Sequence, residues 1–392
     1  MKKKILFVNG HLNVGGVENS LLNVLKNIDY DFYEVDLILF EELGDYAIEV
    51  PKEVNITYYN LSKTFGPFKQ CMFDNIKEGN WFAIFLRFIF LLEKIIGVRA
   101  LSLAKPIFKI HTKYDCAIAY RVGICTDFVG FIVNSPNKIS WWHHGTYDIP
   151  VNQNKRWLKV LRKYNRLIAV SESCKEMLNI NIHGIHQKLF TIPNIINVGE
   201  IRKKAKESNA YNFINFNDGV TLLSVGRLSP EKGMINCVHA CKKLVDNGCD
   251  VKWYLIGEGT ERNEIESCIR EYNLENNIFL LGAIANPYPY IKNAHIYVHP
   301  SLVESLSITV LEALALSTPV IVAKSMGPME FIRNKENGLL VEPSPEGLFK
   351  GIVSLLEDKK LYEHLKEDKS EVLRNYSPDV IMRKIYGLIE VG

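Results

Sequence analysis

The sequence predicts an α/β protein made of two doubly wound, Rossmann-like domains with parallel sheets. Apolar strand patterns alternate with helical patterns in both halves of the chain, which is the order that parallel βαβ units require. The predicted strands are continuous apolar runs, as expected for sheets covered by helices on both faces. A length of 392 residues exceeds one ordinary hydrophobic core and suits two domains.

The strands of the two halves share this apolar character. In the first half they are predicted at residues 5–9, 35–40, 56–61, 114–120, 138–142, 166–170 and 189–192. In the second half they are predicted at residues 221–225, 251–256, 278–281, 296–299 and 319–323, with helices between them. Each half therefore contains enough βα units for a sheet of its own.

A polar stretch rich in Asn, Lys and Asp, residues 194–219, is predicted to be the linker between the halves. We therefore expect an N-terminal domain at residues 1–195 and a C-terminal domain at residues 196–375. Residues 376–392 are predicted to form a helix that packs back on the N-terminal domain. Doubly wound sheets bind ligands beyond the carboxyl ends of their strands, so we expect the two domains to face each other across a cleft.

Composition narrows the class of function. A net charge of +3 gives no argument for nucleic acid as a partner, because such partners usually demand a strongly basic face. The eight cysteines include no CxxC pair, and we interpret them as free thiols of a reducing cytosol rather than zinc ligands. The protein is therefore expected to be cytoplasmic.

The most apolar stretch, residues 81–98, is predicted to be a helix. Charged residues interrupt it, and its apolar runs are far shorter than the roughly 20 residues of a membrane span. It is either a core helix or a helix that rests on a membrane surface, because it is hydrophobic on more than one face. Peripheral contact with the inner face of the cell membrane is therefore one of the expected interactions.

Two clusters in the first half follow predicted strands. Gly15 and Gly16 would let the backbone approach a ligand, and the next helix would present its free N–H groups to an anion, although a tight turn alone also explains them. His143 and His144 can hydrogen-bond sugar hydroxyls or polarise a leaving group. One of these two is equally a structural histidine, so we expect one functional histidine here.

The first cluster of the second half carries two cations. Arg227 and Lys232 lie in the loop after the strand at residues 221–225. A planar guanidinium and an ammonium point charge are the usual pair for holding a diphosphate. Two cations at this position favour ligand binding over an ordinary solvated loop.

The sharpest cluster contains two carboxylates, Glu304 and Glu312. Glu304 is predicted to accept hydrogen bonds from sugar hydroxyls, and the N–H groups of Ser305, Leu306 and Ser307 are predicted to begin a helix and point at phosphate oxygens. Glu312 lies in an otherwise apolar helix segment and needs a partner there, such as ribose hydroxyls. In the alternative interpretation Glu304 caps the helix and Glu312 is exposed.

Together these residues resemble the retaining GT-B glycosyltransferases of family 4, which include capsule and lipopolysaccharide sugar transferases. In the second half the resemblance rests on Gly226-Arg227-Leu228, Glu231-Lys232-Gly233, Pro300-Ser301 with Glu304 and Glu312, and Thr318-Pro319-Val320-Ile321. In the first half it rests more loosely on Gly15-Gly16-Val17-Glu18, Trp141-Trp142-His143 and Val170-Ser171-Glu172-Ser173. Many relatives have Gly-Phe-Gly where this chain has Ser305-Leu306-Ser307.

The resemblance implies a metal-independent, cofactor-free, retaining hexosyltransferase. It implies transfer from a nucleotide-sugar donor, by family habit a UDP-sugar, to a glycan or lipid-linked oligosaccharide acceptor in surface polysaccharide synthesis. The donor is expected in the C-terminal domain, where Arg227 and Lys232 hold the diphosphate, Glu304 meets the sugar and Glu312 meets the ribose. His143 is expected at the reacting centre of the N-terminal, acceptor-binding domain.

No second carboxylate is evident that would act as a nucleophile, so retention is expected through front-face attack by the acceptor hydroxyl. Two other functions suit a similar fold. A nucleotide-sugar epimerase would release a changed nucleotide sugar without an acceptor. A catalytically silent nucleotide-sugar-binding subunit would bind without turnover, although intact clusters in both halves argue against it.

Overall fold

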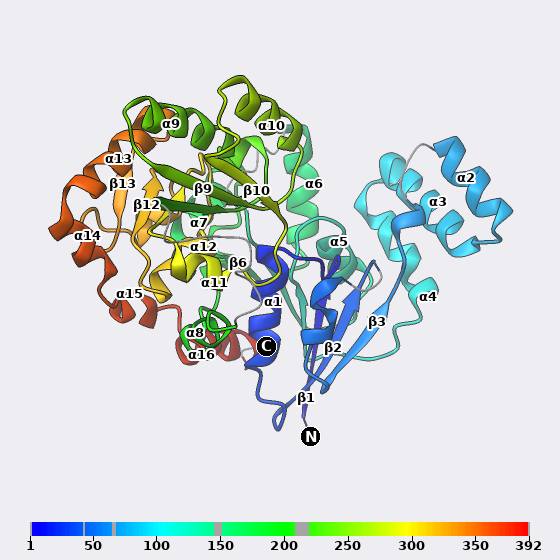
Figure 1. Ribbon diagram of the computed structural model, residues 1–392. Coiled ribbons are helices and arrows are strands. Elements are labelled where there is room, and N and C mark those ends of the chain that lie inside the picture. The colour runs from blue at the N-terminus through cyan, green and yellow to red at the C-terminus, as the bar shows by residue number, and fades with distance from the viewer. Residues whose placement is uncertain (1, 42–43, 65–67, 145–150, 208–218, 391–392) are drawn as a thin grey trace. The chain divides into compact units, whose positions relative to one another are not determined.

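The computed structural model describes residues 2–41, 44–64, 68–144, 151–207 and 219–390 (Figure 1). The chain divides into two compact units. The N-terminal unit comprises Met1–Pro193 and Ile381–Gly392, and the C-terminal unit comprises Asn194–Val380. The predicted domains end at residues 195 and 375, whereas the chain passes between the units at residues 193 and 380.

The N-terminal unit is built on a seven-stranded parallel sheet in the order β3-β2-β1-β4-β5-β6-β7. Its strands are β1 (Lys3–Asn9), β2 (Tyr33–Leu39), β3 (Val54–Tyr58), β4 (Cys116–Ala119), β5 (Asn137–Trp142), β6 (Arg166–Ala169) and β7 (Leu189–Thr191). The central strands β1 and β4 are buried almost throughout, which explains their unbroken apolar sequences.

Helices cover this sheet and extend beyond one end of it. They are α1 (Gly16–Lys26), α2 (Phe68–Lys77), α3 (Trp81–Ile96), α4 (Lys105–Phe108), α5 (Ile124–Phe131), α6 (Val151–Leu161), α7 (Glu172–Asn181) and α16 (Pro378–Glu390). The 3-10 helices η1 (Asp45–Glu49), η2 (Ser62–Thr64), η3 (Val98–Ala104) and η4 (His186–Lys188) fill connections. No helix in the described ranges is both long and apolar enough to cross a membrane.

Helix α16 packs on the N-terminal unit although it comes last in the sequence. The buried Asn137 side chain of β5 donates a 2.8 Å hydrogen bond to the carbonyl of Leu388, and Arg166 donates to the same carbonyl. Tyr386 stacks on Tyr33 of β2 with ring centroids 5.2 Å apart. Both ends of the chain therefore contribute to one unit.

The C-terminal unit is built on a six-stranded parallel sheet in the order β10-β9-β8-β11-β12-β13. Its strands are β8 (Val220–Val225), β9 (Val251–Ile256), β10 (Ile278–Gly282), β11 (Ile296–His299), β12 (Val320–Ala323) and β13 (Leu339–Val341). Its helices are α8 (Val198–Lys204), α9 (Met234–Asp246), α10 (Arg262–Glu271), α11 (Tyr288–Asn293), α12 (Ile308–Ala315), α13 (Pro345–Glu357), α14 (Lys359–Lys366) and α15 (Ser370–Arg374). Two 3-10 helices, η6 (Pro230–Lys232) and η7 (Pro328–Glu330), follow strands.

Two features of this unit differ from the sequence prediction. The predicted linker at residues 194–219 contains helix α8, which is tied to the C-terminal unit because Arg202 donates to the carbonyl of Ala315 and pairs with Asp368. The rest of that linker, residues 208–218, lies outside the described residues. Strand β13 was not predicted, because three residues after an Asn-Gly turn leave too short a pattern.

The strand orders show where each unit can bind a ligand. In each sheet the chain first adds strands on one side of its first strand and then on the other side. This change of side, which we call the sheet reversal, lies between β1 and β4 in the N-terminal unit and between β8 and β11 in the C-terminal unit. Helices on either side of such a point run to opposite faces of the sheet, so the loops beyond the carboxyl ends of these strands form a crevice. Those loops carry the glycines at 15 and 16, the cations of the β8 loop, and Glu304.

Candidate active site

The loops after β8 and β11 bring two predicted site residues into direct contact. The Lys232 Nζ atom at the end of η6 lies 2.5 Å from the Glu304 Oε1 atom. These residues are 72 positions apart in the sequence, and both side chains are mostly buried. The contact follows from the sheet order, because β8 and β11 are neighbours although two βα units separate them in the sequence.

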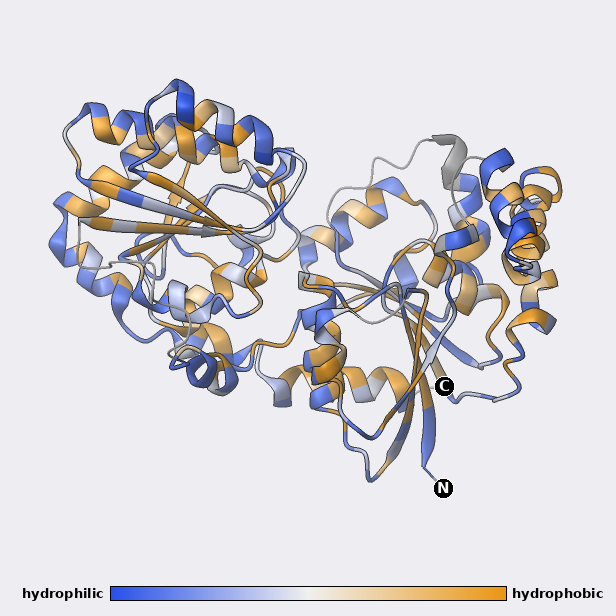
Figure 2. Ribbon diagram, turned by 45° about the vertical axis from the view of Figure 1, so that its right-hand side comes forward, coloured by the Kyte–Doolittle hydropathy of each residue, from blue (hydrophilic) through white to orange (hydrophobic). Residues whose placement is uncertain are grey.

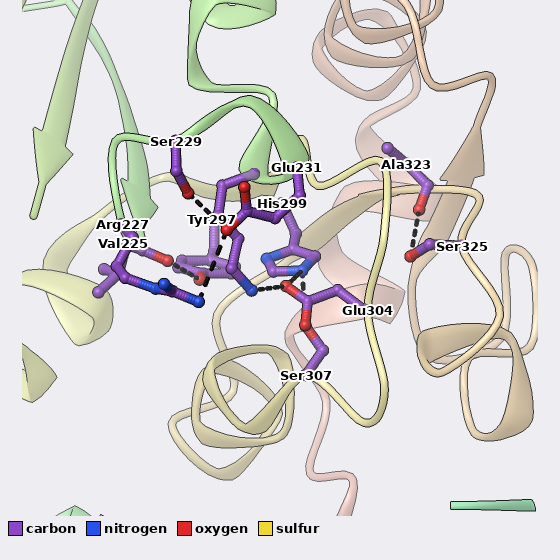
Figure 3. Close-up of polar contacts among 11 residues, drawn as sticks. Val225, Arg227, Ser229, Glu231, Tyr297, His299, Glu304, Ser307, Ala323 and Ser325 are labelled. Atoms are coloured by element: carbon purple, nitrogen blue, oxygen red, sulfur yellow. Dashed lines mark hydrogen bonds and ion pairs between the residues drawn. The ribbon is translucent and has the colours of Figure 1, made fainter. Parts of the chain in front are cut away.

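A histidine and a serine complete the surroundings of Glu304 (Figure 3). The His299 Nε2 atom lies 3.1 Å from Glu304 Oε1, and the Ser307 hydroxyl lies 2.6 Å from the same nitrogen. Burial opposes ionisation of Glu304, but the hydrogen bond from His299 and the charge of Lys232 outweigh it and lower its pKa to about 2. Glu304 is therefore an oriented carboxylate at neutral pH.

Arg227 lies in the same loop as Lys232 but is held less tightly. Its side chain is 66% exposed, and its only ion pair among the described residues is a 3.5 Å contact with Glu231. The Ser229 hydroxyl fixes Glu231 through a 2.7 Å hydrogen bond. An exposed guanidinium of this kind is available to an anionic ligand.

The loop that carries Glu304 packs closely against two glycines, which have no side chain to displace it. Gly233 has a φ of 61°, and a Cβ atom there would lie 2.6 Å from the Pro300 carbonyl oxygen. A Cβ atom at Gly327, which follows β12, would lie 2.4 Å from the Ser305 carbonyl group. Larger residues at either position would displace the loop, which explains these glycines better than turn formation alone.

The sequence pattern predicts a helix at residues 307–316, and the helix of the structure begins one residue later. Helix α12 starts at Ile308, and Ser307 precedes it in the left-handed region with a φ of 68°. Ser307, Ser305 and Leu306 therefore lie in the loop and are not helix-start residues. Among the hydrogen bonds between described main-chain groups, none is donated by the N–H groups of these three buried residues, so they remain free for an anion.

Glu312 is buried inside α12, which excludes the interpretation that it is an exposed helical residue. Its Oε1 atom accepts a 2.9 Å hydrogen bond from the Tyr288 hydroxyl at the start of α11. Burial raises the pKa of Glu312 to about 7, against the opposing hydrogen bond from Tyr288 and the charge of Lys204. The carboxyl group is thus poised between its two protonation states at neutral pH.

In the N-terminal unit, a carboxylate of the protein already lies at the start of α1. Gly15 caps this helix and Gly16 begins it. The buried Glu18 in the first turn pairs with Arg121, which follows β4, at 3.0 Å and lies 3.6 Å from His11. The positive end of the helix is therefore partly compensated by Glu18, and Arg121 supplies a cation at the same edge of the sheet.

His143 follows β5 and lies among aromatic rings. Its ring lies 4.8 Å from that of Tyr120 and stacks parallel to Trp141 at 6.3 Å. Burial, and then the nearby His144, lower the pKa of His143 to about 3; the Tyr120 main chain partly offsets this effect. The residue keeps some exposed surface, yet neither ring nitrogen makes a hydrogen bond of ordinary geometry with a described residue.

We expect His143 to remain neutral across the physiological range. A lowered pKa means that the imidazole gains its proton only far below neutral pH, so its ring ¹⁵N shifts should stay constant from about pH 5 to about pH 8. Long-range ¹H–¹⁵N spectra measure this, and the spectrum of His143→Gln identifies the signals. A titration centred near the ordinary histidine value would contradict the buried environment.

The other histidine of this cluster differs in exposure. His144 is exposed, and its carbonyl accepts a hydrogen bond from the buried Cys174 thiol at 3.2 Å. The next residue, Gly145, lies outside the described residues.

In the described part of the chain, no three His, Cys, Asp or Glu side chains are grouped so that they could hold a metal ion.

Sequence reasoning assigned no role to three residues that shape these sites. They are His299, Tyr288 and Arg121. Two of them could have been predicted from their positions in the sequence. His299 ends a strand and Arg121 comes just after one, and both strands flank a sheet reversal. Tyr288 could not have been predicted, because only the packing of α11 beside α12 brings its hydroxyl to Glu312.

Residues 207–372 match the glycosyl transferases group 1 family. A Campylobacter jejuni protein named N-acetylgalactosamine-N,N'-diacetylbacillosaminyl-diphospho-undecaprenol 4-alpha-N-acetylgalactosaminyltransferase is 34% identical over 201 residues, 51% of this chain and 53% of that protein. An Escherichia coli UDP-Gal:alpha-D-GlcNAc-diphosphoundecaprenol alpha-1,3-galactosyltransferase is 24% identical over 57% of this chain and 59% of its own length. The chain thus spans little more than half of these curated relatives.

A solved structure matches the whole chain. HepE from Anabaena, in complex with UDP and glucose, has a TM-score of 0.74 at 18% identity, and the match covers 100% of both chains. At this identity the likeness concerns the fold. This likeness confirms the predicted GT-B fold, with two Rossmann-like parallel-sheet domains. The residues that match the glycosyl transferases group 1 family make up nearly all of the C-terminal unit.

Proposed function

We propose that the protein is a retaining, metal-independent hexosyltransferase that uses a nucleotide-sugar donor, most simply a UDP-sugar. The observation that carries this proposal is the contact between Lys232 and the ionised Glu304 at the sheet reversal of the C-terminal unit. It places a cation for the diphosphate beside a fixed carboxylate for sugar hydroxyls. The family match of this unit, and the UDP bound by HepE, favour the same class of donor.

In this proposal the bond between the anomeric carbon and the diphosphate oxygen breaks while the acceptor hydroxyl oxygen bonds to the same face of that carbon. The hydroxyl proton passes to the departing diphosphate. Arg227, Lys232 and the free N–H groups of residues 305–307 stabilise the negative charge that builds up there. These groups take the place that a divalent cation fills in metal-dependent transferases, and no cofactor takes part.

The remaining residues bind and orient the substrates. Glu304 accepts hydrogen bonds from the donor sugar, and Glu312 with Tyr288 receives the ribose hydroxyls. His143 is assigned to the reacting centre as a neutral imidazole, which can accept or donate one hydrogen bond. Gly15 and Gly16 are assigned to the donor because glycines at the start of α1 would let the backbone approach a phosphate closely.

For the acceptor, we propose a glycan or lipid-linked oligosaccharide in the synthesis of a surface polysaccharide such as capsule or lipopolysaccharide. The names of the Campylobacter jejuni and Escherichia coli relatives both include an undecaprenol-linked diphosphate. Because such acceptors are anchored in a bilayer, we further propose a cytoplasmic protein in peripheral contact with the inner face of the membrane.

The test is to incubate the purified protein with UDP-glucose, UDP-galactose and their N-acetylated forms, with and without an undecaprenyl-diphosphate-linked sugar. Transfer only with acceptor, retained anomeric configuration by NMR, and full turnover in EDTA are expected. A changed nucleotide sugar without acceptor would instead indicate an epimerase. Tight binding without turnover would indicate a silent subunit, and activity lost in EDTA and restored by Mg²⁺ would refute metal independence.

A further inference from the structure

Helix α3 presents a row of large apolar side chains to solvent. These side chains share one face, because they recur at intervals of four and three residues. They are Trp81, Phe85, Phe88, Leu92 and Ile95, and all five are exposed. The opposite face is buried against the N-terminal unit through Ala83, Ile84, Leu86 and Ile89. One face of the helix therefore belongs to the core, and the other face is an exposed apolar surface. The sequence analysis had treated a core helix and a surface helix as alternatives.

Two of the three charged side chains of α3 point toward the protein rather than toward water. Arg156 of α6 donates 2.7 Å hydrogen bonds to Glu93 of α3 and to Asp127 of α5. Arg87 donates to the main-chain carbonyl of Thr64. A helix on a water-exposed surface has the reverse arrangement, with charges outward and apolar residues inward. The outer face of α3 is thus suited to an apolar environment.

The preceding helix extends this apolar surface. On α2, which packs beside α3, Phe73 and Ile76 are exposed at an interval of three residues, and Lys69 lies on the same face. Leu103 of η3 adds another exposed apolar side chain. We call Phe73, Ile76, Trp81, Phe85, Phe88, Leu92, Ile95 and Leu103 the α2–α3 surface. These helices lie together beyond one end of the sheet (Figure 1), and hydrophobic residues are prominent in them (Figure 2).

The charge around the α2–α3 surface indicates what covers it. Residues 68–113 contain eight Lys or Arg and only three Asp or Glu, a surplus that exceeds the +3 of the entire chain. One of the acids, Glu93, is already neutralised by Arg156. Seven of the basic residues are exposed, namely Lys69, Lys77, Lys94, Arg99, Lys105, Lys109 and Lys113. A second copy of this surface would bring like charges together, whereas an anionic lipid surface complements both its charge and its apolar face.

We propose that the α2–α3 surface docks on the anionic face of a lipid bilayer, with Trp81, Phe85 and Phe88 inserted at the headgroup boundary and the surrounding lysines at the phosphates. This inference specifies the residues behind the peripheral membrane contact proposed above. The aromatic rings supply apolar area, and tryptophan suits the interface because one end of its indole can remain hydrated. The docked helices lie in the N-terminal unit, which is also the proposed acceptor-binding unit.

The experiment compares two triple variants of the full chain in co-sedimentation with vesicles. The test variant carries Trp81→Ser, Phe85→Ser and Phe88→Ser. The matched control carries Phe32→Ser, Ile48→Ser and Ile180→Ser, three apolar residues that are 68%, 91% and 65% exposed elsewhere on the N-terminal unit. Vesicles of phosphatidylcholine with phosphatidylglycerol are compared with vesicles of phosphatidylcholine alone.

The parent protein and the control are expected to bind the phosphatidylglycerol vesicles and to be released by high salt. The test variant should bind them about tenfold or more weakly, because three inserted side chains are lost. The Trp81 emission, obtained by subtracting the spectrum of Trp81→Phe, should shift to the blue on binding. Absence of binding by the parent, or equal loss in test and control, would overturn the proposal.

Dimer formation through the α2–α3 surface and loss of the donor site are each tested by one further measurement. If the parent is a dimer in size-exclusion chromatography and the test variant a monomer with unchanged vesicle binding, a second copy covers the surface and the proposal is wrong. UDP binding measured by calorimetry should be unchanged in the test variant, because none of the three substituted residues is assigned to the donor. Retained UDP binding also shows that a failure of vesicle binding is not a failure of the proposed transferase function.

Discussion

Lys232→Ala is expected to lower kcat/KM for sugar transfer by about 10- to 150-fold, which corresponds to the 1.5–3 kcal/mol typical of a charge-assisted hydrogen bond. The side chain has two tasks in the proposed site. It holds the leaving diphosphate, and it keeps Glu304 ionised and oriented through the 2.5 Å contact. Without this ammonium group, His299 would be the remaining hydrogen-bond partner of that oxygen among the described residues, and the pKa of Glu304 should rise.

Steady-state kinetics with a UDP-sugar and calorimetry with UDP measure this effect. Lys243→Ala is a suitable control, because Lys243 also forms an ion pair, at 3.0 Å with Glu346, but both partners are about half exposed. An exposed pair of this kind contributes little to stability or binding, so the control should keep near-parental kinetics. Parental kinetics for Lys232→Ala would rule out the diphosphate role.

Glu312→Gln is expected to make the protein more stable and less active at the same time. The folded protein holds Glu312 at a pKa of about 7, above its ordinary value, because burial disfavours the charge. Between these two values the unfolded chain has already lost the proton that the folded protein retains. Glu312 therefore destabilises the folded state increasingly as pH rises between these two values, and by about 3 kcal/mol above neutral pH. Glutamine removes this cost and can still accept the hydrogen bond from Tyr288.

Thermal or urea unfolding of parent and variant across the pH range measures the difference. The two proteins should have similar stability near pH 4, and the advantage of the variant should grow as pH rises from about 4.5 to about 7 and then level off. Glu346→Gln is the exposed control and should show no such gain. The affinity for UDP-sugar should fall in Glu312→Gln if the carboxylate receives the ribose. A variant that is less stable at every pH would show that Glu312 is an ordinary structural residue.

The sequence predicted those parts of the site that depend on local order along the chain. Arg227, Lys232 and Glu304 were predicted as site residues because each follows a strand, and the carboxyl ends of parallel strands carry ligand sites. The pairing of Lys232 with Glu304 could not be predicted, because it depends on β8 lying beside β11. The pairing of Glu18 with Arg121, 103 residues away, depends in the same way on β1 lying beside β4.

Other differences have local physical causes. The predicted linker was polar in sequence but contains α8, which is tied to the C-terminal unit because Arg202 binds a carbonyl and a carboxylate there. Helix α12 begins after Ser307 rather than at it, because a residue with positive φ does not continue a right-handed helix. The apolar helix at residues 81–98 was predicted, but the inward direction of Glu93 depends on Arg156, which the sequence alone does not bring near.

The position of α16 has a consequence for synthesis on the ribosome. Strand β5 is complete early, but the side-chain NH₂ group of the buried Asn137 acquires its acceptor, the carbonyl of Leu388, only when that residue emerges. At about 5 to 20 residues per second, the roughly 190 residues between these parts of the N-terminal unit take on the order of 10 to 40 s to translate. During that interval the C-terminal unit is being made and can begin to fold, while the earlier sheet still lacks its last helix. The half of the protein that is made first is therefore the half that is finished last.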